Sequence, residues 1–274
     1  MATQPELRNP RLVAVWPGMG HVGVNAGIYL LSKLEMTLFA EFDTTTLFDT
    51  EAVQVKGGLI RPARRPRSRL FLWTDPEQKH DLLVFLGEAQ PPLGKYQFCR
   101  ELLKYARGLG VDRVWTFAAM ATPMRPGDSS RVYAAATDEE RLSELRQLEL
   151  ELVEDGQIGG LNGVLLGVAA EEGLSGACLL GEMPHIFSQL PFPKASLAVL
   201  EVFATQTGLD LDLDELREQA DAVEEQLGDL LDQVERQMGN RGGGDEDEDE
   251  EDEEEEDADA GEEEEPAAPG APPG

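Results

Sequence analysis

The stretch "VAVWPGMGHVGVNAGIYLLSK", residues 13–33, decides the fold and poses the first question about function. It begins with an apolar run, passes through Gly18, Gly20 and Gly23, and continues with apolar residues at helical spacing. An apolar run followed by a helical period is typical of a β-strand that leads into an α-helix. The glycine spacing is also that of a dinucleotide-binding turn, in which backbone amides at a helix N-terminus hold phosphate.

Two features of this turn weigh against a nucleotide site. Pro17 removes one amide donor, and His21 stands where such loops usually keep the backbone clear. Glycine also recurs in residues 159–181, as expected where helices pack closely on strands. In favour of a nucleotide, Glu-Phe-Asp at 41–43 stands about where a ribose-binding acid would be needed. We predict that the glycines serve close packing of the first helix on the sheet, and nucleotide binding remains the alternative.

Apolar strands alternate with helical patterns along the chain. The patterns predict strands at 12–16, 36–42, 68–74, 81–88, 111–121, 131–137 and 176–181, and helices at 22–34, 93–108, 138–148 and 161–172. Such alternation is typical of an α/β fold with a mostly parallel sheet that is covered by helices on both faces. Strand 36–42 is expected to complete a βαβ unit with strand 12–16.

The last patterned segment predicts one long helix, residues 209–238. Its apolar residues recur at alternating spacings of three and four, with acidic residues between them. They are Leu213, Leu216, Ala220, Val223, Leu227, Leu230 and Val234. A stripe of this kind packs on a partner, which is either the helix's own domain or a second subunit.

Residues 239–274 differ in composition from the rest of the chain. They contain 18 acidic residues, one arginine, and no Val, Ile, Leu or aromatic residue. Such a segment buries too little apolar surface to offset its ordering entropy, so we expect a disordered acidic tail. Residues 1–238 are then expected to form a single α/β domain that includes the last helix.

The formal net charge of −31 makes the protein strongly acidic, and 17 of these charges lie in the tail. An acidic surface repels phosphate backbones and anionic lipid, so nucleic acids and membranes are not expected as partners. The local exception is "RPARRPRSR", residues 61–69, with five arginines and no acid. It is either a solvated loop or hairpin, or a docking site for an acidic protein segment such as the tail itself.

Cys99 and Cys178 are the only cysteines, and each lies in an apolar pattern. This indicates neither a disulfide framework nor a metal site. The sequence shows no apolar leader core and no apolar run of membrane-spanning length. We therefore expect a cytoplasmic protein.

Two strands end alike, since "LLVFLGEAQPP" and "GACLLGEMPH" each run into Gly-Glu with a proline shortly after. Because the carboxyl ends of parallel strands share one edge, Glu88 and Glu182 could face a common crevice with the glycine turn. There they could do acid and base chemistry beside His21 or His185. The alternative is that each glutamate binds a neighbouring backbone and each histidine is structural. No Walker P-loop, nucleophile-elbow or zinc-protease motif occurs, so no catalytic, cofactor-binding or metal-ligating residue is assigned.

Two stretches carry a family resemblance: "VAVWPGMGHVGVNAGIYLLSKL", and "GGLNGVLLGVAAEEGLSGACLLGEMPHIFSQLPFPKASLAVLEVF". Over residues 12–234 the chain resembles the proteasome assembly chaperone family, the archaeal and bacterial homologues of the second eukaryotic proteasome assembly chaperone. The resemblance implies a three-layer α/β/α sandwich similar to nucleoside phosphorylase-like folds, with a C-terminal helical portion and assembly into homo-oligomers. The residues that match the signature, without an assigned reaction, are Gly18, Gly20, Gly23, Asn162, Gly163, Gly181, Glu182 and Pro184.

The resemblance implies a protein-binding chaperone or scaffold and not a catalyst, with protein clients that include proteasome subunits and with no cofactor. Some relatives dock on the proteasome through a C-terminal hydrophobic-Tyr-x motif, whereas this sequence ends "PAAPGAPPG" behind its acidic run, so that mode is not expected. The alternative is an enzyme or small-molecule binder that takes a nucleoside or a phosphorylated ligand in the crevice. The crevice residues would be Gly18, Gly20, His21, Gly23, Glu88, Asn162, Gly163 and Glu182.

Overall fold

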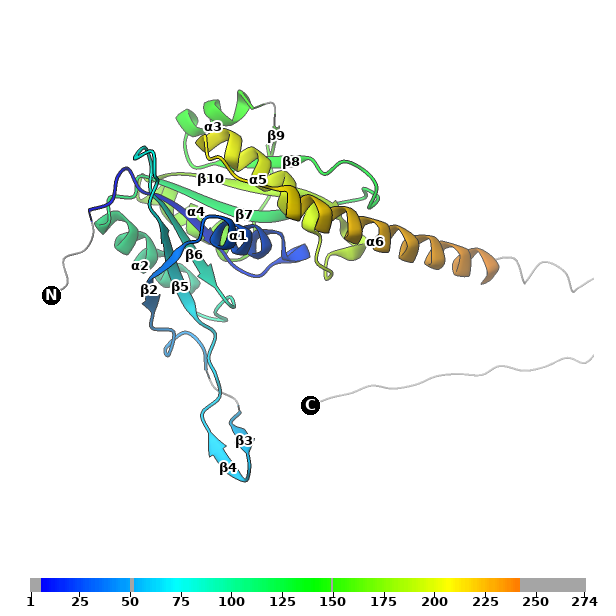
Figure 1. The fold of residues 1–274 in the computed structure, drawn as a ribbon, viewed down its shortest axis with the longest axis horizontal. Coiled ribbons are helices and arrows are strands. Elements are labelled where there is room, and N and C mark those ends of the chain that lie inside the picture. The colour runs from blue at the N-terminus through cyan, green and yellow to red at the C-terminus, as the bar shows by residue number, and fades with distance from the viewer. Residues whose placement is uncertain (1–5, 50–51, 149, 242–274) are drawn as a thin grey trace, which may run out of the picture. The chain divides into compact units, whose positions relative to one another are not determined.

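The computed structural model describes residues 6–49, 52–148 and 150–241, and Figure 1 shows the course of the chain. The chain divides into two units, Met1–Leu231 and Asp232–Gly274. The expected acidic tail falls almost entirely outside the described residues, and a domain boundary after residue 238 stays a prediction. Residues 239–241 do not begin an irregular tail, because they continue the last helix.

The first unit is built on an eight-stranded sheet with the strand order β2-β5-β6-β1-β7-β10-β8-β9, and β3 and β4 form a separate two-stranded hairpin. The strands are β1 Arg11–Val15, β2 Thr37–Phe42, β3 Gln54–Lys56, β4 Leu59–Arg61, β5 Ser68–Trp73, β6 Leu82–Gly87, β7 Arg113–Thr122, β8 Val132–Ala136, β9 Glu151–Leu152 and β10 Ser175–Pro184. The helices are η1 Met19–His21, α1 Val22–Lys33, α2 Lys95–Gly108, α3 Glu139–Arg146, α4 Gly160–Glu171, η2 His185–Phe187, α5 Pro193–Thr207 and α6 Asp214–Arg241.

The sheet is mixed, with a parallel centre. Strands β6, β1, β7 and β10 run parallel to one another, while β5 pairs antiparallel with β6, and β8 pairs antiparallel with β10. The prediction of a βαβ unit between the first two strands was wrong. Strand β2 pairs antiparallel with β5 at the edge of the sheet, and the neighbours of β1 are β6 and β7. After α1 the chain runs to the edge of the sheet, because the position beside β1 is occupied by β6. Strand β6 is buried along its whole length.

Two layers of helices cover the sheet and make the fold a three-layer α/β/α sandwich. Alternation along β1 sends Val13 and Val15 to one face, where they pack with residues of α1, α5 and α6. Leu12 and Ala14 point to the other face and pack with residues of α2 and α4. The central strands are therefore apolar on both faces, as expected for a parallel sheet between helices.

The glycines of α1 allow this helix to lie unusually close to the sheet. A Cβ atom at Gly23 would overlap the carbonyl oxygen of Phe117 in β7, and one at Gly27 would overlap the Val15 side chain in β1. Both residues are buried. The packing role predicted for the glycines is confirmed at these two positions.

Helix α6 uses its apolar stripe in two different ways. Leu216, Ala220 and Leu227 are buried in the core cluster that also contains α1 and α5. Further along, Leu230 and Val234 are 41% and 40% exposed. The first part of the stripe therefore packs on its own domain, and pairing with a second subunit remains a prediction for the exposed part.

The hairpin β3–β4 contributes no residue to either core cluster. All of its strand residues are exposed, and among them are Val55, Leu59 and Ile60. Val55 and Ile60 face each other across the hairpin and therefore lie on the same side of it. A lone two-stranded hairpin is only marginally stable in water, so this segment needs an outside contact to be well ordered.

We predict opposite effects for two Gly→Ala substitutions in helices. Gly23→Ala should lower the free energy of unfolding by about 1–3 kcal/mol, since the added methyl group would push against the rigid backbone of β7. Gly167→Ala on α4, where a Cβ would meet nothing within 4 Å, should raise it by about 0.5–1 kcal/mol. Urea unfolding of both variants and the wild type tests this. Equal stability of the two variants would contradict a packing role for Gly23.

Candidate functional site

The glycine turn lies at the carboxyl end of β1 and is closed by the protein's own backbone. The amide N–H of Gly20 donates to the carbonyl oxygen of Ser188 at 2.9 Å, and the amide of Phe192 donates to the carbonyl oxygen of Gly20 at 2.9 Å. The amide of His21 donates to the carbonyl oxygen of Gly18 at 3.1 Å. The amides that a phosphate would need at Gly20 and His21 are therefore already in use.

Backbone conformation explains why the turn contains Gly20. Its φ of 59° lies in the left-handed region, and a Cβ there would press on the side chain of Met183. His21 also has a positive φ, 53°, but its side chain is exposed and makes no capping hydrogen bond to α1. The exposed imidazole is a surface group of the turn.

A cavity of about 520 Å³ opens beside this turn, at the carboxyl ends of the parallel strands. Its lining includes Gly18 from the turn, Gly23 from the start of α1, residues 118–121 of β7, and Val153 with residues 155–160, which lead into α4. Asn162, in the first turn of α4, completes the lining on that side. This cavity lies at the edge of the sheet where the sequence led us to expect a crevice.

Gln90 joins the two walls of the cavity. Its side-chain amide donates to the carbonyl oxygen of Pro17 at 2.9 Å, and its Oε1 accepts the amide N–H of Leu161 at 3.0 Å. One side chain thus ties the glycine turn to the N-terminus of α4. This role could not be predicted, because a glutamine after a strand is an ordinary loop residue.

The predicted crevice residues divide into two groups. Gly18, Gly23 and Asn162 line the cavity together. The residues that are not among its lining are Gly20, His21, Glu88, Gly163 and Glu182. At Gly163 the reason is close packing, since a Cβ would overlap the carbonyl oxygen of Ile158.

Glu182 is buried and forms an ion pair with the half-exposed Arg131. It is 2% exposed, and its carboxylate accepts hydrogen bonds from the Nε and Nη2 atoms of Arg131, both at 2.8 Å, and from Thr122 Oγ1 at 2.8 Å. The two-pronged bond from Arg131, helped by Thr122, lowers the pKa of Glu182 to about 2, against the opposing effect of burial. This carboxylate is therefore an anion at neutral pH and does not supply a proton there. His185 contacts the same threonine, since its Nδ1 lies 3.0 Å from the carbonyl oxygen of Thr122.

Glu88 lies in a separate group of charges and does not meet Glu182. Its carboxylate accepts from Arg64 at 2.8 and 3.0 Å, from Arg69 at 3.1 Å, and from the backbone amide of Arg67 at 3.1 Å. Glu88 thus fastens the arginine-rich segment to the end of β6. The idea of paired carboxylates for acid and base chemistry is not supported, because each glutamate is paired with arginine.

Within residues 6–49, 52–148 and 150–241, no group of three or more His, Cys, Asp or Glu side chains is placed to hold a metal ion. Cys99 and Cys178 are both buried free thiols, and burial raises the pKa of each to about 12. Neither is activated as a nucleophile. In the same described part of the chain, no helix combines the length and apolar character that crossing a membrane requires.

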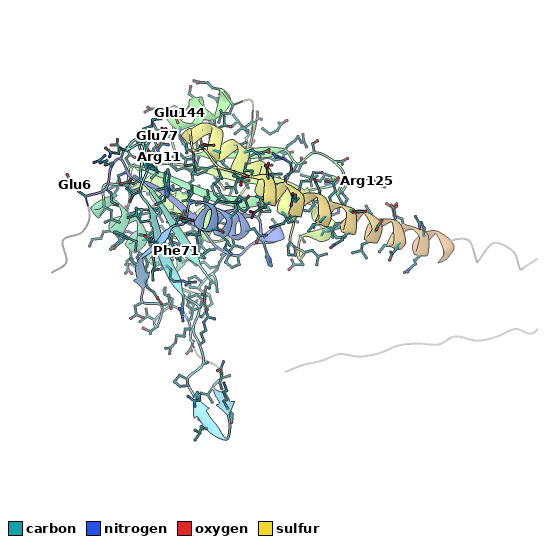
Figure 2. All side chains as sticks on the ribbon, viewed as in Figure 1. Glu6, Arg11, Phe71, Glu77, Arg125 and Glu144 are labelled. Atoms are coloured by element: carbon teal, nitrogen blue, oxygen red, sulfur yellow. The ribbon has the colours of Figure 1, made fainter. Side chains whose placement is uncertain are left out.

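A second cavity, of about 320 Å³, lies at the opposite end of the sheet, where β1 and β6 begin. Figure 2 shows Arg11 and Glu77, two of its lining residues, at that end. Asp75 in its lining is used within the local loop, since it accepts the backbone amides of Glu77, Lys79 and His80. This cavity was not predicted, since its lining combines strand, helix and loop residues that share no motif.

We predict that the ion pair of Glu182 stabilises the fold at neutral pH. Glu182→Gln should lower the free energy of unfolding at pH 7 by about 2 kcal/mol, because the buried side chain at this position loses its charge-assisted hydrogen bonds with Arg131. The pKa of Glu182 is lowered from 4.5 to about 2, so the wild-type advantage should be complete above about pH 4.5 and disappear as the pH falls toward 2.

Urea unfolding between pH 7 and about pH 3 measures this difference. The control is Glu201→Gln, which breaks a half-exposed pair with Arg217 and should change stability by less than about 1 kcal/mol. A Glu182→Gln protein that is as stable as the wild type at pH 7 would contradict the assignment.

Comparison with known proteins identifies the fold and the family. The model of the PAC2 family matches residues 12–231. PbaB from Pyrococcus furiosus, described as an archaeal proteasome activator, is 27% identical, with a TM-score of 0.69 over 84% of this chain and 95% of PbaB. A PAC2 family protein from Streptomyces avermitilis is also 27% identical, with a TM-score of 0.70 over 81% of this chain and 95% of that protein.

Two further archaeal proteins extend the comparison. PbaA from Pyrococcus furiosus, described as a homologue of proteasome-assembly chaperone, is 26% identical, with a TM-score of 0.64 over 86% of this chain and 98% of PbaA. An uncharacterised protein from Methanocaldococcus jannaschii is 28% identical over 222 residues, which are 80% of this chain and 82% of that protein. The match spans the glycine turn, the whole sheet and most of the last helix, and the chain belongs to the PAC2 family.

Proposed function

We propose that this protein is a non-enzymatic, protein-binding scaffold of the proteasome-assembly-chaperone kind, which acts as a homo-oligomer in the cytoplasm. The observation that carries the proposal is the likeness to PbaB and PbaA, which extends over 84% and 86% of this chain. Those proteins are described as a proteasome activator and as a homologue of proteasome-assembly chaperone. The clients proposed for this chain are proteins, among them proteasome subunits.

The chemistry of the described residues supports binding over catalysis. The two strand-end glutamates are both paired with arginine, and the two thiols are buried with raised pKa values. Two buried free thiols also suit a reducing compartment. The scaffold is proposed to consist of residues 1–238, with the acidic residues after them as an unstructured extension.

The exposed apolar side chains of the hairpin β3–β4 support self-association. Val55 and Ile60 are 68% and 75% exposed and lie on one side of the hairpin. Isolated exposed aliphatic residues are common, but a cluster on a segment without core contacts is typical of an interface. We assign this face to contact with a second copy of the chain. The exposed end of the α6 stripe, at Leu230, is the other surface available for that contact.

Light scattering coupled to size-exclusion chromatography tests the proposal directly. The full chain should elute as an oligomer, and it should co-elute with purified proteasome particles or with separated proteasome subunits. A monomer that binds neither proteasome particles nor proteasome subunits would contradict the proposal. Turnover of any metabolite by the purified protein would point to the enzyme class instead.

We predict that Val55→Asp combined with Ile60→Asp weakens self-association by at least about tenfold, since two charges would be buried in an apolar contact. Leu230→Asp is the matching change on α6. The control is Leu93→Asp, a lone residue that is 79% exposed and should leave the oligomer intact. Mass measured over a dilution series distinguishes the surfaces. An unchanged mass for both the hairpin variant and the α6 variant would exclude these two faces as the interface.

A further inference from the structure

The cavity beside the glycine turn contains a buried polar group that no described residue satisfies. Asn162 is 5% exposed, and its Oδ1 atom is buried without a hydrogen-bond partner. Asn162 lines the cavity from the first turn of α4. Leaving a buried amide oxygen unpaired costs free energy, so such groups usually have a partner that binds there.

The walls around Asn162 are mainly apolar. The cavity volume of about 520 Å³ falls within the range of roughly 300–1,000 Å³ that is typical of small-molecule sites. The apolar side chains that contribute to the lining are Trp16, Met19, Ala118, Ala119, Met120, Ala121, Val153, Ile158 and Leu180. An apolar chamber with few polar groups is the usual composition of a ligand pocket.

The charges around the cavity exclude an anionic ligand. Among the residues that the structure describes, Asp155 is the one charged residue in the lining, and no lysine or arginine contributes to it. The amides of Gly20 and His21 are bonded to carbonyl oxygens of the protein, as described above. A phosphate would therefore meet a carboxylate and no cation, which is unfavourable in an apolar site.

We propose that this cavity binds a small uncharged molecule that carries an amide group, such as a lactam. The N–H of the ligand donates to Oδ1 of Asn162, and its carbonyl oxygen faces the amides at the N-terminus of α4. That terminus is suited to an acceptor, since the first amides of a helix have no partner within the helix. One of them, at Leu161, is already bound by Gln90. The site is independent of the proposed protein-binding role.

The three tryptophans provide separate reporters for this proposal. Trp16 lines the cavity, and its indole N–H is buried without a partner. Trp73 lines the second cavity, at the other end of the sheet. Trp115 is buried, with its indole N–H bonded to Gln206 Oε1 at 3.0 Å. A ligand in the proposed site should therefore move the indole resonance of Trp16 and leave the other two in place.

The experiment is an NMR titration of the full chain labelled with ¹⁵N-tryptophan. Binding is followed by the indole N–H resonances, which are assigned with Trp→Phe variants. The probes are 2-piperidone, its N-methyl derivative and inorganic phosphate, each at millimolar concentrations. We expect a saturable shift of the Trp16 resonance with 2-piperidone. The N-methyl derivative should bind at least about tenfold more weakly, because it lacks the N–H donor. Phosphate should leave the resonance unchanged.

Two variants make the test specific to Asn162. Asn162→Leu keeps the size of the side chain but removes its oxygen, and should weaken 2-piperidone binding by at least about tenfold. The control is Asn25→Leu, the same change on α1, outside the lining of the cavity. Circular dichroism and native mass establish that both variants fold.

The proposal is overturned by any of four results with folded protein. These are no shift of Trp16 with 2-piperidone, equal binding of the N-methyl derivative, a response to phosphate, or unchanged binding by Asn162→Leu. A shift confined to Trp73 would place the ligand in the second cavity and would likewise overturn the proposal.

Discussion

The close approach of α1 to the sheet is the constraint on which the rest of the structure depends. At Gly23 the helix backbone lies against the carbonyl oxygen of Phe117, with no room for a Cβ atom. This contact sets the position of the turn that precedes α1. The same turn holds the segment after β10, because the backbone of Gly20 forms hydrogen bonds with the backbones of Ser188 and Phe192. One side of the cavity is thus fixed by a contact between two backbones, which is far less adaptable than a contact between side chains.

Charge pairing performs a second structural task in this acidic protein. Glu182 and Glu88 end two strands, and each binds arginine from a segment distant in the sequence. The pair of Glu182 and Arg131 joins β10 to the start of β8, and Glu88 anchors the stem that leads from the hairpin. These contacts fix loops at the same edge of the sheet as the cavity. In both contacts the carboxylate holds two parts of the fold together.

Much of the fold was predictable from periodicity. The apolar run at 12–16 and the glycine-rich helix after it correspond to β1 and α1, and the glycine packing at Gly23 followed from the same stretch. The partner of β2 was not predictable, because strand pairing depends on which apolar strand fills the place beside β1, and the later β6 is the more apolar one. Proximity in sequence favoured the wrong neighbour.

The site was predictable only in outline. The shared edge of the parallel strands indicated a crevice at the glycine turn, and the cavity there is lined by Gly18, Gly23 and Asn162, the last of which was named only through the family resemblance. The shared edge wrongly suggested that Glu88 and Glu182 would meet, since a strand-end carboxylate goes to the nearest cation: Arg131 belongs to no motif, and nothing in the arginine-rich segment 61–69 indicated that Arg64 would pair with Glu88. Gln90 and the buried Arg141, which stacks on Trp115, were missed for the same reason, because single side chains that bridge segments leave no periodic trace.

The two edge strands of the eight-stranded sheet affect how copies of the chain can associate. One edge is β9, only two residues long and with Glu151 exposed, and the other is β2, whose pairing is interrupted by a bulge between Leu38 and Ala40. Short, charged or bulged edges are poor templates for an added strand. Intermolecular extension of the sheet, the usual route from a β-rich protein to fibrous aggregates, is therefore obstructed at both ends. At the eight-stranded sheet, contacts with other chains would therefore have to use side-chain surfaces, which can be reversible and selective for a partner.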